Sequence, residues 1–195
     1  IDAGSGLIFV KAGTYEISLS DDESYIVVKN NVWLKGEGAD VTIFKAVGTV
    51  TSDPYTVAMF HLRNNSRLSD LTINMNGLSL SYESPYSSAW YYGVILGGNG
   101  QSAANSKVEN VKIKNVKIPG SVTGLTPACL NMFYSSGAIV RDVYFYDSAV
   151  GLVITHPSTV SYYDSSNYSE CTSQRLSQRY LREGSFRLHH EWYYK

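Results

Sequence analysis

Three stretches decide the fold: Leu68-Ser-Asp-Leu-Thr-Ile-Asn74, Val108-Glu-Asn-Val-Lys-Ile-Lys114 and Val140-Arg-Asp-Val-Tyr-Phe-Tyr146. All three follow one pattern: apolar, any residue, Asp or Asn, apolar, any, apolar, any. The apolar members are expected to face a core. The Asp or Asn is expected to form a tight turn, because its side chain bonds to nearby backbone and tolerates a left-handed conformation. The pattern therefore predicts a repeated, strand-based unit.

Another apolar strand flanks each copy, at about residues 56–62, 92–96, 128–132 and 150–154. Longer connections are expected at about residues 78–91 and 119–127. A coil of short strands cannot bury its apolar face alone, whereas stacked coils share a continuous core. A β-sandwich, the alternative, also gives short strands, but it does not readily explain the recurring Asp or Asn. We therefore predict an all-β solenoid, with Ala58, Gly93, Cys129 and Gly151 as equivalent positions.

Composition narrows the function classes. Charged residues make up 17% of the chain, against about 25% in typical globular proteins. The net charge of −1 offers no general attraction to nucleic acid. No run approaches the roughly 18 apolar residues of a membrane helix. The two cysteines, Cys129 and Cys171, do not make a disulfide scaffold and are expected to be isolated thiols. No metal or cofactor site is predicted.

Two further motifs carry a resemblance. Gly6-Leu-Ile-Phe-Val-Lys-Ala-Gly-Thr-Tyr-Glu-Ile17 and Asn31-Val-Trp-Leu-Lys-Gly-Glu-Gly-Ala-Asp-Val-Thr-Ile43 resemble the opening units of the pectate-lyase-like right-handed β-helix superfamily. That group includes phage tailspikes, rhamnogalacturonase-like enzymes and epimerases. The resemblance covers about residues 1–172. It implies a right-handed parallel β-helix that engages polysaccharide outside the cell, on a cell surface or on a virion.

The same resemblance bears on the organisation of the chain. Residues 1–173 are expected to form the coils, and residues 174–195 an off-pattern tail or cap. The start at Ile1-Asp-Ala is similar to the end of the short helix that precedes the opening strand in this superfamily, which suggests a fragment. A homo-oligomer, either a trimer or a filament, is the expected assembly, with no insertion into a membrane.

Catalytic motifs are incomplete. Polysaccharide hydrolysis usually needs two carboxylates, yet the positions where the resemblance implies one hold Tyr92, Ala128 and Val150. Glu83 is the one weak catalytic candidate. A lyase or hydrolase is therefore implied by the resemblance alone.

Aromatic residues give the best lead to function. A predicted insertion is rich in tyrosine and tryptophan, whose rings suit stacking on sugars. The alternative is that these rings pack against the wall of the coils. A carbohydrate-active enzyme, a non-catalytic glycan-binding spike and a structural or filament protein all remain open. The predicted saccharide-binding residues are Tyr82, Tyr86, Trp90, Tyr91 and Tyr92, with His61 and Asn131 on neighbouring strands.

Overall fold

A computed structural model of the chain describes residues 5–19, 25–50, 56–80, 89–98, 100–116, 125–148, 150–154, 167–169 and 172–174. The regular elements in these ranges are all β-strands. Within them there is no helix with the length and apolar character needed to cross a bilayer.

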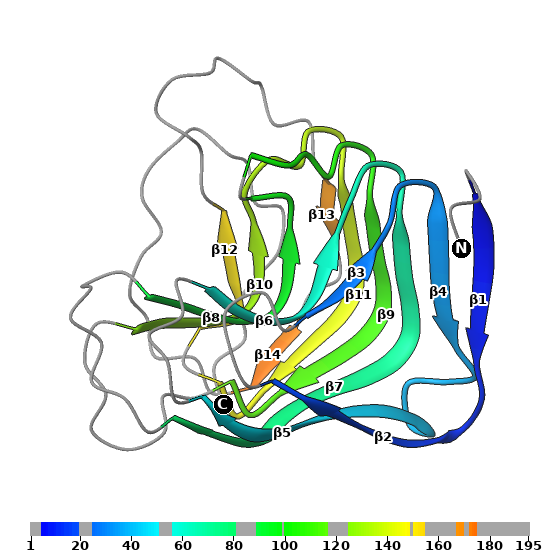
Figure 1. The fold of residues 1–195 in the computed structure, drawn as a ribbon. Helices are drawn as coiled ribbons and strands as arrows, with labels where there is room; N and C mark the ends of the chain where they lie inside the picture. The colour runs from blue at the N-terminus through cyan, green and yellow to red at the C-terminus, as the bar shows by residue number, and fades with distance from the viewer. Residues whose placement is uncertain are drawn as a thin grey trace.

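The strands form successive coils (Figure 1). The first coil contains β1 (Gly6–Val10), β2 (Gly13–Ser18) and β3 (Ile26–Val28), and the second contains β4 (Val32–Gly36), β5 (Thr42–Val50) and β6 (Thr56–Leu62). The later coils contain β7 (Arg67–Leu80) with β8 (Ala89–Leu96), β9 (Lys107–Lys114) with β10 (Leu125–Met132), β11 (Ile139–Tyr146) with β12 (Leu152–Ile154), and β13 (Asn167–Ser169) with β14 (Thr172–Gln174).

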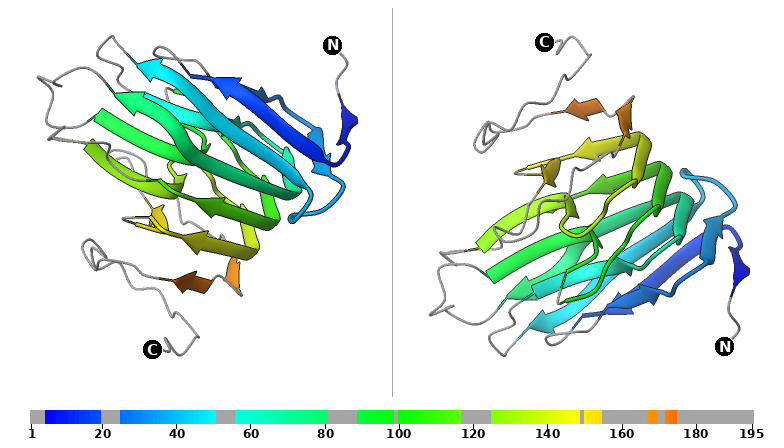
Figure 2. Two further views of the ribbon diagram at one scale, coloured as in Figure 1. Left: turned by 90° about the horizontal axis from the view of Figure 1, so that it is seen from below. Right: turned by 90° about the horizontal axis from the view of Figure 1, so that it is seen from above.

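Equivalent strands of successive coils pair in parallel and build three layers (Figures 1 and 2). We name them the side layer (β1, β4, β13 and the first halves of β7, β9 and β11), the lower layer (β2, β5, β14 and the second halves of β7, β9 and β11) and sheet B (β3, β6, β8, β10 and β12). The predicted solenoid is confirmed. The chain is a right-handed parallel β-helix, the sense that parallel crossovers adopt.

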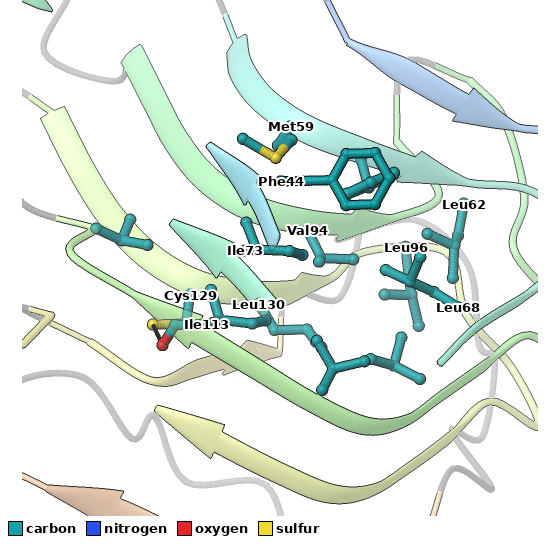
Figure 3. Packing of buried hydrophobic residues seen from close by; sticks show 14 of the residues in the cluster. Phe44, Met59, Leu62, Leu68, Ile73, Val94, Leu96, Ile113, Cys129 and Leu130 are labelled. Atoms are coloured by element: carbon teal, nitrogen blue, oxygen red, sulfur yellow. Dashed lines mark hydrogen bonds between the residues drawn. The ribbon is translucent and has the colours of Figure 1, made fainter. Parts of the chain in front are cut away.

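The repeated pattern forms the core in register. Leu71 pairs with Val111 and Val111 with Val143, and these three side chains have no exposed surface. The next inward row, Ile73, Ile113 and Phe145, is buried to the same degree. Figure 3 shows such side chains meeting residues of sheet B inside the coils. Burying each contributes about 1.5–3 kcal/mol, so the stacked rows hold the coils together.

The Asp or Asn of each repeat turns the chain from the side layer into the lower layer. Asp70, Asn110 and Asp142 have φ angles of 58°, 52° and 53°, as the pattern predicts. Asn110 Nδ2 also donates to Asp70 Oδ1 at 2.7 Å. A second ladder precedes the side layer, where Asn65 Nδ2 donates to Asn31 Oδ1 at 3.1 Å. Both ladders link successive coils at their corners.

The Lys-Gly-Glu-Gly motif has a structural role at the corner between β4 and β5. A Cβ on Gly36 would lie 2.2 Å from the Asp70 carbonyl oxygen, so only glycine fits against the next coil. Glu37 Oε2 accepts a hydrogen bond from the Ala12 backbone N–H of the preceding coil at 2.7 Å. The motif therefore joins three coils.

One predicted alignment is wrong by a residue. Ala58 pairs with Tyr92, and Tyr92 pairs with Ala128, so Met59, not Ala58, is level with Gly93 and Cys129. The strand pairing is interrupted at the level of Met59, Gly93 and Cys129, because the strands of sheet B bend there (Figure 1). A Cβ on Gly93 would lie 2.5 Å from Ile113 Cγ2, so the bend requires glycine in this coil.

The predicted connections and the predicted tail lie only partly within the described residues. β7 runs to Leu80 and β8 begins at Ala89, so the long connection predicted at 78–91 is narrower. Its residues 81–88 lie outside the described part of the chain, as do most of 119–127. Strand pairing continues to Gln174. The tail or cap predicted for 174–195 lies outside the described residues apart from Gln174, and it stays a prediction.

Candidate functional site

The residues predicted to bind saccharide divide into three groups. Tyr82, Tyr86 and the weak catalytic candidate Glu83 lie outside the described residues. Trp90 belongs to β8, but its side chain is not among those described. Tyr91, Tyr92, His61 and Asn131 are placed with their side chains. The prediction that β8 lies between the strands carrying His61 and Asn131 is confirmed.

Tyr91 and Tyr92 correct the prediction of a surface loop. Both lie in strand β8, and they are only 1% and 2% exposed. The Tyr91 side chain points inward and its hydroxyl donates to the Met75 carbonyl at 3.4 Å. Burial raises the pKa of this hydroxyl. The expectation that these two rings offer free faces at the surface is wrong. Strand β8 begins at Ala89, earlier than the start predicted at residue 92, so both tyrosines are strand residues with buried side chains.

Tyr92 belongs to a second apolar cluster, on the outer side of sheet B. It packs there with Ala58, Ile95 and Ala128. Tyr91, the preceding residue of the strand, belongs to the core cluster inside the coils. Tyr92 and Ile95 face the same side although they are three residues apart, because the strand bends between them at Gly93. The bend therefore brings the side chains of two outward positions of one strand into contact.

Polar side chains lie in line across this outer side. His61 pairs with Ile95 and Ile95 pairs with Asn131, one coil apart at each step. His61 is 1% exposed and Asn131 has no exposed surface. Buried polar side chains are costly and need hydrogen-bond partners. Both side chains are therefore covered in this structure, and each depends on hydrogen-bond partners within the fold.

His61 is held by three neighbours. Its Nε2 lies 2.8 Å from the Gly97 carbonyl oxygen of the next coil, and Arg63 Nη1 lies 2.7 Å from the same nitrogen. The Tyr25 ring meets the imidazole edge-on, with 5.0 Å between centroids. Among the described residues, Nδ1 has no hydrogen-bond partner. With the proton on Nε2 the ring donates to Gly97, and with the proton on Nδ1 its Nε2 accepts from Arg63; one neutral tautomer cannot do both.

The surroundings of His61 keep it neutral. Burial, followed by the charge of Arg63, lowers its pKa to about 4, and the Gly97 carbonyl opposes this only in part. The ring is therefore neutral throughout the physiological pH range. Arg63 is half-buried and forms no ion pair with a carboxylate of the described residues. Within the described part of the chain, a cation without a carboxylate partner thus lies beside a neutral histidine.

Sequence reasoning missed Arg63, Tyr25 and Gly97. For Arg63 a signal was present, since residues two apart on a strand face the same side. Tyr25 and Gly97 come from the coils before and after, so only the stacking brings them to His61. The strands of sheet B contain no Asp or Glu. In the described part of the chain, no group of His, Cys, Asp or Glu side chains is arranged to hold a metal ion.

Comparisons with known proteins agree with this architecture. Neither a family model nor a curated protein sequence matches the chain. Among solved structures, it is similar to the A-module of a mannuronan C-5 epimerase from Azotobacter vinelandii, with a TM-score of 0.50 and 16% sequence identity. That module is a right-handed parallel β-helix. The likeness is one of fold.

The match covers different shares of the two chains. The aligned region covers 89% of this chain but 51% of the epimerase module, so the chain spans about half the length of the structure that it resembles. At this identity the comparison assigns no role to His61, Arg63 or Asn131. Their roles are argued from their own geometry.

Proposed function

We propose that this chain is the polysaccharide-binding part of a secreted or surface-exposed β-helix protein, and that an acidic polysaccharide lies across the outer side of sheet B. The observation that carries the proposal is the half-buried Arg63, held against His61 beside the row of His61, Ile95 and Asn131, with no compensating carboxylate among the described residues. The similar epimerase module is named for its action on mannuronan, which supports a sugar polymer as the ligand.

The direction of the row suits a polymer. His61, Ile95 and Asn131 follow one another along the stacking axis, with one coil between successive members. Neighbouring strands lie about 4.7–4.9 Å apart, so equivalent positions repeat at short, regular steps. A linear polysaccharide also repeats its hydrogen-bonding groups at regular steps. A chain laid along the axis therefore meets a new coil at each step.

Each side chain has a chemical role in the proposal. The Arg63 guanidinium donates to a sugar carboxylate, a charge-assisted bond of the stronger kind. His61 is 1% exposed and Asn131 has no exposed surface, so in the proposal they support the binding surface from below and do not touch the sugar. Tyr82 and Tyr86, which precede β8 in the sequence, and Trp90 in β8 remain proposed stacking residues. Secretion, a cell-surface or virion location and a tailspike role belong to the same proposal.

The proposal is one of binding. Glycoside hydrolysis uses a pair of carboxylates, and the strands that present His61 and Asn131 carry none. Binding without cleavage needs only the cation and the polar row.

Binding is tested by calorimetric titration of the chain with acidic and neutral oligosaccharides of equal length. We expect the acidic oligomers, oligomannuronate or oligogalacturonate, to bind more tightly. Arg63→Gln should lower that affinity by about tenfold or more, since a hydrogen bond to a charged group contributes about 1.5–3 kcal/mol.

Lys11→Gln is the matched control. It removes the same charge at the exposed corner between β1 and β2, away from sheet B. Equal losses in the two variants would reduce the effect to net charge. Equal affinity for neutral and acidic oligomers would overturn the choice of ligand.

A further inference from the structure

A second cluster of aromatic and charged side chains lies on the outer face of the lower layer, apart from sheet B. Tyr144 and Tyr146 both face outward from β11, on either side of the inward Phe145. Their ring centroids are 6.5 Å apart and their planes differ by 20°. Both side chains are half-buried, so part of each ring meets solvent.

Cations flank the two rings in the neighbouring coil. Strand pairing sets Lys112 of β9 beside Tyr144, and Lys114 beside Tyr146. Both lysines are half-buried, which leaves their ammonium ends within reach of the tyrosines. Two parallel rings and two ammonium groups therefore share one patch of the sheet.

The corner loop of the second coil borders this patch. Thr72 Oγ1 donates to the Ala39 carbonyl, which holds the loop over the lower layer. Lys112 Nζ donates to Asp40 Oδ1, and this bond raises the pKa of Lys112, so the lysine is charged. Lys114 has no ion pair with any carboxylate in the described ranges. With Asp40 compensating Lys112, the patch retains one positive charge.

We propose that Tyr144, Tyr146, Lys112 and Lys114 form a second saccharide-binding surface, which takes an acidic sugar unit. The inference rests on the proposed function in that its ligand is the same class of polymer. Tyrosine rings pack against the apolar faces of sugars while their hydroxyls bond at the rim. The free ammonium of Lys114 matches a sugar carboxylate, and the Lys112–Asp40 pair offers a donor and an acceptor for hydroxyls.

Two surfaces on one chain change how a long polymer is held. After a polymer binds at sheet B, its second contact is governed by an effective local concentration, not by the bulk concentration. The avidity for long polymers then exceeds the affinity for short oligomers without any new type of contact. Short oligomers bind each surface independently.

The test uses NMR titration of the full chain with an acidic oligosaccharide too short to reach both faces. Ring signals of Tyr144 and Tyr146 report the second surface, and the methyl signals of Ile95 report sheet B. We expect both sets to shift, with separate saturation. Lys114→Gln combined with Tyr146→Ala should weaken the binding seen at Tyr144 by about tenfold, while the Ile95 titration is unchanged.

Lys45→Gln is the matched control, because Lys45 lies on the same outer face but is paired with Glu16 at 3.0 Å. It should leave both titrations unchanged. Shifts at Ile95 alone would overturn the second surface and leave the proposed function standing. Shifts at the tyrosines alone would support the second surface and overturn the placement on sheet B. A single-stranded oligonucleotide shifting the tyrosines equally would overturn the saccharide assignment, and no shift anywhere would overturn both proposals.

Discussion

At the scale of single residues, His61 shows how burial and a nearby cation act on one titratable group. It is 1% exposed, Arg63 lies against it, and its pKa is lowered from 6.5 to about 4. Above pH 6.5 the ring is neutral in both the folded and the unfolded chain. As the pH falls from 6.5 to about 4, His61 binds a proton in the unfolded chain but not in the folded chain, so stability is lost in this pH range.

This linkage predicts a pH-dependent difference between the native chain and His61→Gln, which cannot titrate. The free energy of unfolding of the native chain should fall by roughly 3 kcal/mol more than that of the variant between pH 6.5 and pH 4, with no further divergence below. Urea unfolding at several pH values measures it, and the common titrations of other groups cancel in the comparison. Parallel curves for the two proteins would contradict the buried, neutral state of His61.

At the scale of elements, the corner turns depend on a conformation that few residues accept. Asn110 has a φ of 52° and links its coil to Asp70. Asn110→Gly and Asn110→Val both remove that hydrogen bond, so their difference reports the backbone alone. We expect valine to cost about 1–3 kcal/mol more than glycine, because a β-branched residue is strained at positive φ. Thermal or urea unfolding checks this, and equal stabilities would remove the conformational explanation of the repeat.

The side layer is held by a charge network as well as by its apolar rows. Glu109 lies 2.7 Å from Arg67 Nε in the coil before and 2.5 Å from Arg141 Nη2 in the coil after. The Arg67 guanidinium also covers the Trp33 ring at 4.1 Å. Glu109 is thus a strand residue that joins three coils. A carboxylate between two cations in successive strands disfavours a slip in register, since a slip would separate the charges.

At the scale of the whole molecule, the first coil of the stack differs from the middle coils. In β1, Leu7, Ile8 and Phe9 are 58%, 45% and 52% exposed, whereas Leu34, in the row of Ile8, is buried. No described strand pairs with the other edge of β1. An apolar, unpaired edge strand is a template for association. Pairing of this edge with a second copy is what the structural or filament alternative requires.

We therefore expect the isolated chain to associate with itself as its concentration rises, and Phe9→Lys to suppress this. A charge on an edge strand opposes pairing with another copy. Sedimentation velocity over a wide range of concentration measures the association, with Asn76→Lys, an exposed change elsewhere, as the control. A native chain that sediments as a monomer at every concentration would show that this edge needs no second copy.

The sequence by itself determined the parallel solenoid, its inward rows and its corner turns. These follow from local pattern: alternation decides which side chains face inward, and Asp or Asn accepts the positive φ at each corner. The tertiary structure alone decided the site. The register of the bend set Met59, not Ala58, level with Gly93, and turned Tyr91 into the core. It also brought Tyr25, His61 and Gly97 together from three coils. Such contacts depend on the lengths of the connections between coils, which shift one strand against the next without changing the local pattern that either strand carries.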